Sequence, residues 1–188
     1  MRESVVFSET LEVVKIPQGK DVTIDEGTEG FLVQVRGGNA TVRIPSKLWQ
    51  VQLDPDQVDA LEKSNGGELD VDLEPAAESR YDGVPEDLEE AVYQELRKCY
   101  DPEIPVNVVD LGLIYGVETK ELGEESHRVD VDMTLTAEGC GMGEHLAGDA
   151  EKKIRAIPGV DEVDVSIVWD PKWNENMMTD EAREKLGM

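Results

Sequence analysis

A cysteine set between glycines is the residue in this sequence best suited to chemistry. The run TAEGCGMG, residues 136–143, removes side-chain bulk around Cys140, so a metal, another backbone or a partner can approach its sulfur. The residues before the run alternate between apolar and polar as in a strand, and those after it recur at helical spacing. Cys140 is therefore expected on a strand-to-helix turn, where the helix N-terminus favours the thiolate that binds metals or attacks electrophiles. The competing interpretation is a small hydrophobic residue buried at a turn.

An acidic loop at residues 101–115 is a second candidate for the wall of a site. Asp101, Glu103 and Asp110 interrupt an otherwise apolar run, and two prolines restrict the backbone of that run. Such rigidity suits a binding site. The alternative is structural, with the two aspartates capping backbone groups while the apolar residues fill the core.

The other cysteine and the two histidines are weaker candidates. Cys99 is in phase with the apolar positions of a preceding helical segment, and we expect it to be buried. His145 follows Cys140 by five residues, whereas a spacing of three or four brings two helical side chains together, so we expect it to face solvent. His127 stands in a polar turn and is expected on the surface.

The first part of the chain reads as a small β-rich domain over residues 1–74. Runs of β-branched residues predict strands at 12–14, 21–24, 31–35 and 41–44, and an alternating strand follows at 49–53. Asp54 and Pro55 are typical of a helix start, and the glycines after Asn65 of a stop, so a short helix is expected within 55–64. Residues 75–84, rich in proline, alanine and acids, read as a linker.

Residues 85–188 are expected to form a second domain that contains both the Cys140 turn and the acidic loop. The pattern predicts a helix from Leu88 to Cys99, strands at 113–118 and 128–135, a helix at 143–157, a strand at 162–169 and a short helix at 179–186. The order α-β-β-α-β indicates a two-layer sandwich with helices on one face of a small sheet. The fold class expected for the whole chain is therefore mixed α/β (α+β).

A segment rich in large apolar side chains lies between the last two of these elements. Trp169, Trp173, Met177 and Met178 surround a proline turn. They are able to cover the thiol, to form a subunit interface or to pack the core under a loop, and the sequence leaves these alternatives open.

Composition excludes several classes of partner. Acidic residues outnumber basic ones by 43 to 18, and the formal charge of −25 repels nucleic acid and anionic membranes. No apolar run approaches the roughly 20 residues that cross a bilayer, and the first residues show no signal peptide. Two distant cysteines make no disulfide framework, so we expect a cytoplasmic protein with reduced thiols.

Several motifs of the second domain resemble those of the SufT-type iron–sulfur cluster assembly proteins. They are DPEIP at 101–105, DLGLIY at 110–115, MTLT at 133–136 followed by Gly139 and Cys140, IPGV at 157–160 and WDP at 169–171. The resemblance implies an auxiliary maturation factor whose partners are the iron–sulfur assembly machinery and client apoproteins. It also implies that Cys140 is the key cysteine and metal ligand, with Asp101, Glu103 and Thr136 as the other residues of the cluster-binding site.

The number of cysteines limits how this chain could bind an iron–sulfur cluster. Common iron–sulfur clusters take about four thiolates, whereas this chain has two cysteines and only Cys140 is expected to be accessible. A transient cluster would bridge two subunits of a homodimer, borrow ligands from a small thiol or a partner, or use oxygen ligands. No nucleophile, base and oxyanion set is evident, so we expect a protein that is not an enzyme. The alternatives are a thiol redox protein, which would lack a nearby resolving cysteine, and an interaction adaptor that binds no metal.

Overall fold

The computed structural model describes residues 3–66, 69, 81–101, 104–137 and 141–188. The chain divides into two compact units, Met1–Glu74 and Pro75–Met188. Each unit has its own buried apolar cluster, one centred on residues such as Phe7 and Ile44 and the other on residues such as Leu96 and Met133.

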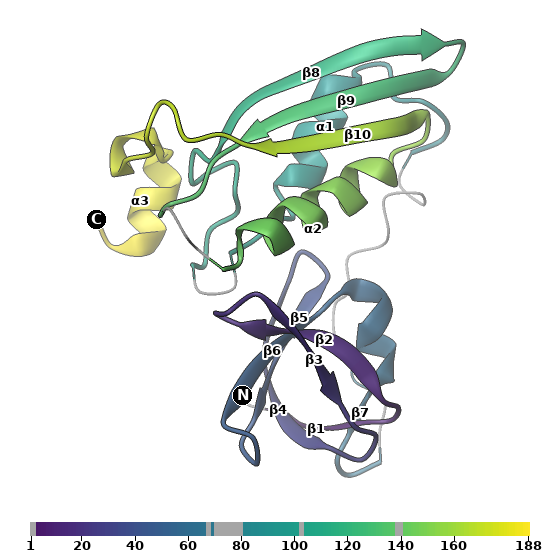
Figure 1. Ribbon diagram of the computed structural model, residues 1–188, viewed down its shortest axis with the longest axis vertical. Coiled ribbons are helices and arrows are strands. Elements are labelled where there is room, and N and C mark those ends of the chain that lie inside the picture. Colours follow the sequence, from purple (N-terminus) through teal and green to yellow (C-terminus); the bar gives the residue numbers. More distant parts are fainter. Residues whose placement is uncertain (1–2, 67–68, 70–80, 102–103, 138–140) are drawn as a thin grey trace. The chain divides into compact units, whose positions relative to one another are not determined.

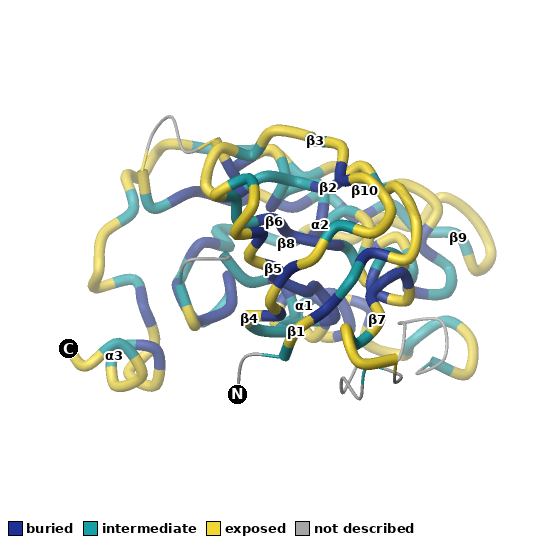
Figure 2. Tube along the Cα trace, turned by 90° about the horizontal axis from the view of Figure 1, so that it is seen from below, coloured by how far each residue is buried: buried dark blue, intermediate teal, exposed yellow. Residues whose placement is uncertain are grey.

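The first unit is a curled antiparallel sheet of seven strands (Figure 1). The strands are β1 (Glu3–Phe7), β2 (Leu11–Ile16), β3 (Lys20–Ile24), β4 (Glu29–Arg36), β5 (Asn39–Ile44), β6 (Trp49–Leu53) and β7 (Leu61–Lys63). Their order in the sheet is β3-β2-β6-β5-β4-β1-β7. The central strand β5 is buried at five of its six positions, as the dark segment in Figure 2 shows.

The helix expected within residues 55–64 is wrong in type and length. A 3-10 helix, η1 (Pro55–Ala60), is followed directly by β7, and Leu61 pairs with Phe7 of β1. Burial of Leu61 in the core and its backbone pairing outweigh the local tendency to continue as a helix. β1 and β7 form through contacts far apart in the sequence and were not expected from local pattern.

The second unit confirms the predicted α-β-β-α-β order and the mixed α/β class. Its elements are α1 (Leu88–Leu96), β8 (Ile114–Gly123), β9 (Ser126–Met133), α2 (Gly143–Arg155), β10 (Val160–Ile167), η3 (Glu175–Met177) and α3 (Asp180–Leu186). β9 is the middle strand, antiparallel to β8 and parallel to β10. Among the described residues, the longest helix, α2, has 13 residues, and no helix could span a bilayer.

The core of the second unit lies between one face of the sheet and helices α1 and α2. Both helices lie on the same side of the sheet (Figure 1), where Val129, Val131 and Met133 of β9 are buried. The residues between them in the sequence, Asp130 and Asp132, therefore project from the opposite, open face.

Candidate functional site

The structure describes two of the four residues predicted to form the cluster site. Asp101 and Thr136 are half-buried, whereas Glu103 and Cys140 lie outside the described residues. The positions of the elements on either side of Cys140 are nevertheless defined by the contacts that they make.

The end of β9 is fixed against three neighbouring segments. Thr134 donates its N–H to the carbonyl of Leu113 at 2.8 Å, and the carbonyl of Met133 accepts from the N–H of Val168 at 2.8 Å. At Gly143, where α2 begins, an added Cβ would lie 2.4 Å from Cδ1 of buried Leu135. The glycine thus allows the start of α2 to pack directly on the chain that follows β9.

The acidic loop is tied down mainly through its backbone. Val108 donates to the carbonyl of Cys99 at 2.9 Å, and the Asn107 amide donates to Oδ2 of Asp110 at 2.8 Å. Val106, Val108 and Leu111 are buried in the core. These apolar residues fill the core, as the structural alternative predicts, whereas the Asp110 carboxylate accepts from the Asn107 side chain and, within the described ranges, is not seen to cap a backbone group. Asp101 remains a candidate of the site.

The C-terminal segment packs under this loop. The indole N–H of Trp173 donates to the carbonyl of Leu111 at 2.8 Å, and the N–H of Thr179 donates to the carbonyl of Asp110 at 2.9 Å. Met178 is buried in the same core, whereas Trp169 is 42% exposed. Core packing thus explains Trp173 and Met178, and Trp169 alone keeps a large open surface.

Cys99 is buried, as predicted. Its side chain is fully excluded from solvent, and this desolvation, followed by the nearby carboxylate of Asp149, raises the pKa of the thiol well above its ordinary value. The Cys99 thiol is therefore protonated near neutral pH and unavailable as a ligand.

Two ion pairs with buried carboxylates lie near Cys99 and were not predicted from the sequence. Glu95 on α1 pairs with Lys98, and Asp149 on α2 pairs with Lys153. Both carboxylates are at most 5% exposed. The signal that would have revealed them is their phase, because each acid falls on the apolar stripe of its helix, one turn after a buried residue.

The predictions for the two histidines are wrong. His145 is half-buried and its Nε2 atom is excluded from solvent, because the first turn of α2 is embedded more deeply than its polar residues suggest. His127 belongs to β9 instead of a turn and is half-buried, with Nδ1 3.2 Å from the carbonyl of Gly159.

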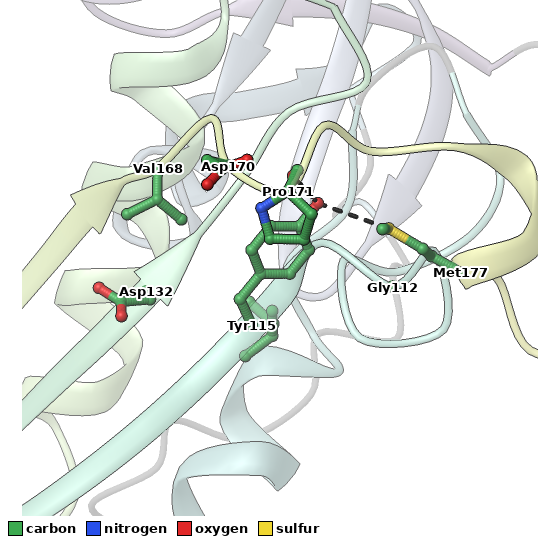
Figure 3. A pocket seen from close by; sticks show the side chains of 8 residues that line it. Gly112, Tyr115, Asp132, Val168, Asp170, Pro171 and Met177 are labelled. Carbon is green, nitrogen blue, oxygen red and sulfur yellow. Dashed lines mark hydrogen bonds between the residues drawn. The ribbon is translucent and has the colours of Figure 1, made fainter.

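A pocket of about 540 Å³ opens where β8 begins and β9 ends. We call it the Tyr115 pocket (Figure 3). Its described lining consists of Gly112, Ile114, Tyr115, Asp132, Val168, Asp170, Pro171 and Met177. The Tyr115 hydroxyl donates to the carbonyl of Pro171 at 2.8 Å and lies 3.4 Å from Sδ of Met177.

The described residues contain no group of three or more His, Cys, Asp or Glu side chains able to hold a metal ion. Cys140 and Glu103 are not among these described residues. Iron–sulfur clusters are bound by cysteine thiolates, and Cys140 is a cysteine that could supply one.

The fold of the second unit is that of a known class of small α/β domains. The crystal structure of a domain of unknown function, DUF59, from Bacillus anthracis matches with a TM-score of 0.50 and 33% identity, over 54% of this chain and 92% of that chain. A family model described as iron–sulfur cluster assembly protein matches residues 89–167.

Curated relatives agree with this match. The chain is 43% identical to an Fe-S protein maturation auxiliary factor of Porphyromonas gingivalis. The alignment of 99 residues covers 53% of this chain and 90% of that protein. The chain is 38% identical to the Fe-S protein maturation auxiliary factor SufT of Staphylococcus aureus, over 47% of this chain and 96% of that protein. The chain belongs to the iron–sulfur cluster assembly protein family, and the resemblance to SufT-type proteins is confirmed.

Proposed function

We propose that the protein is an auxiliary factor in the maturation of iron–sulfur proteins and that Cys140 is the residue that holds the cluster as cargo. The observation that carries the proposal is the match to the auxiliary factor of P. gingivalis over 90% of that protein's length. The names of this and other relatives are those of maturation factors and cluster carriers, which supports a role other than catalysis.

The two thiols have separate parts in this proposal. Cys99 is buried and its pKa is raised, so Cys140 is the thiol left to act as ligand. The same burial removes the partner thiol that a redox cycle within one chain would need, which speaks against the thiol redox alternative. A single protein thiolate holds a cluster weakly, and weak ligation suits a cargo that must leave.

We propose that Asp101, Glu103 and Thr136 form the polar surroundings of the cluster. Their support is the motif resemblance. Asp101 and Thr136 come from segments that the Val108–Cys99 and Thr134–Leu113 hydrogen bonds fix to the same core.

The proposed setting is the reducing cytoplasm, where the thiols stay free, and the proposed partners are assembly proteins and client apoproteins. A homodimer in which two Cys140 thiolates share one cluster would double the ligand number. Because each chain carries a formal charge of −25, the dimer should strengthen with added salt. Light scattering of the cluster-loaded protein over a salt series tests this, and a monomer at every salt concentration would exclude the bridging arrangement.

Anaerobic reconstitution of the full chain with ferrous iron and sulfide tests the cluster-binding role. We expect the visible absorption of an iron–sulfur cluster for the wild type and for Cys99→Ala, and its loss for Cys140→Ser. Circular dichroism of both variants controls for folding. Equal cluster binding by wild type and Cys140→Ser would overturn the assignment of Cys140.

A further inference from the structure

We propose that the Tyr115 pocket is a docking site that receives an arginine side chain of a partner protein. None of the described residues that line this pocket is among those assigned to the cluster. The test of the docking site does not involve Cys140, so its failure would leave the maturation role untouched.

The first support is an excess of negative charge at this end of the open sheet face. Farther along that face, Asp130 pairs with Lys120 at 2.8 Å and with Arg128 at 2.7 Å, and these pairings lower the pKa of the Asp130 carboxyl. Asp132 and Asp170 line the pocket, are exposed and form no ion pair in the described part of the chain. Two carboxylates are thus left without a counter-charge within one concave surface.

The second support is a preformed aromatic wall. The bond from the Tyr115 hydroxyl to Pro171 joins β8 to the segment after β10, and Met177 packs on the same hydroxyl. Behind this wall, Gly112 lies so close to Met177 that an added Cβ would stand 2.2 Å from the Met177 carbonyl oxygen. The ring therefore has little freedom to move when a ligand enters, which lowers the entropic cost of binding.

These features together fit a guanidinium group. Arginine combines a flat, weakly hydrated cation that stacks on aromatic rings with donors arranged for carboxylates. In the view of Figure 3, Asp132 and Asp170 flank Val168, while the Tyr115 ring and Pro171 lie beside them. A divalent cation takes six or more oxygen ligands, whereas this pocket offers two carboxylates on separate segments. The described residues contain no group of three or more His, Cys, Asp or Glu side chains that could hold a metal ion.

Charge also decides the kind of partner. A chain with a formal charge of −25 attracts a basic surface from a distance, whereas a second copy, with 18 basic against 43 acidic residues, offers few cations to this pocket. We therefore assign the pocket to a different protein that presents an exposed arginine.

An NMR titration of the full-length ¹⁵N-labelled protein tests the proposal. The probe is an end-blocked peptide of sequence Gly-Ser-Arg-Ser-Gly, and its analogue with citrulline in place of arginine has nearly the same shape without the charge. We expect the arginine peptide to shift the amide signals of Tyr115, Asp132 and Asp170 in a saturable way, and the citrulline peptide to leave them unchanged.

Variants separate a specific pocket from general attraction to an acidic protein. Asp132→Asn and Asp170→Asn should each weaken binding about fivefold, as for partly exposed charge pairs, and added salt should weaken it further. Glu89→Gln makes the same charge change on the exposed side of α1 and should leave binding unchanged. Equal shifts by the two peptides, shifts confined to other residues, or equal weakening by all three variants would overturn the proposal.

Discussion

Replacing Gly112 by alanine is expected to destabilise the second unit strongly. Gly112 has φ +70°, a conformation that costs an L-residue about 1–2 kcal/mol. An alanine Cβ would also stand 2.2 Å from the carbonyl oxygen of Met177, well inside van der Waals contact. The C-terminal segment must therefore move away from the acidic loop to admit the methyl group.

That movement breaks hydrogen bonds that hold the segment. The bonds at risk are Trp173 to Leu111, Tyr115 to Pro171 and Thr179 to Asp110. Loss of two of them costs about 1–3 kcal/mol at typical net values. Together with the backbone strain, the expected loss in unfolding free energy is about 3 kcal/mol, or a fall in Tm of roughly 10 °C for a unit of this size.

Differential scanning calorimetry of the full chain measures the effect, and Gly148→Ala is the matched control. Gly148 lies within α2, has open space around an added Cβ and no left-handed φ, so alanine there should stabilise by about 0.5–1 kcal/mol. If Gly112→Ala and Gly148→Ala unfold within 1 °C of each other, the packing of the C-terminal segment described above is wrong.

Three further predictions follow from the buried groups. In the native protein, Cys140 should react with iodoacetamide at neutral pH while Cys99 reacts only after unfolding; mass mapping of the modified thiols checks this, and equal rates would refute the burial of Cys99. Because the pKa of Cys99 is raised in the folded state, its contribution to stability is present below the thiol's ordinary pKa of about 9 and is lost as pH rises further. Urea unfolding between pH 8 and 11 should therefore show a steeper loss for wild type than for Cys99→Ala. Asp149→Asn removes the buried carboxylate that pairs with Lys153, whose side chain is 12% exposed, and should cost about 2 kcal/mol in the same assay, between the values for exposed and buried pairs. Glu151→Gln on the exposed side of α2 should change stability by less than about 0.5 kcal/mol.

Local pattern was sufficient where one side of an element is buried. In β9, Val129, Val131 and Met133 face the helices and alternate with Asp130 and Asp132, so the strand was readable from the sequence. β8 was expected to end at 118 but continues to Gly123. Its second half was not predicted because the residues there are exposed and show no alternation of apolar and polar side chains. Its pairing with β9, including Lys120 opposite Arg128, extends the hairpin beyond what hydrophobicity indicates.

The candidate site was only partly predictable from the sequence. Motif resemblance predicted the family, which the family match confirms, and the helical phase of the apolar residues predicted the burial of Cys99, which the structure confirms. The role of Cys140 stays a proposal. The Tyr115 pocket was not foreseen, since it joins residues such as Tyr115 and Pro171 that are brought together by tertiary contacts. The ion pair of Asp149 and Lys153 was not predicted, because an aspartate is almost never fully buried and its place on a helix does not by itself reveal a partner.

Transfer of a cluster to an apoprotein is the most direct test of the central claim. The protein, reconstituted anaerobically with iron and sulfide and freed of excess reagents, is mixed with an apo form of an iron–sulfur enzyme, and recovery of that enzyme's activity is followed in the presence of a chelator. We expect rapid recovery of activity with wild type and with Cys99→Ala, and none with Cys140→Ser. Recovery that is equally fast with Cys140→Ser, or no faster with wild type than with free iron and sulfide, would contradict it.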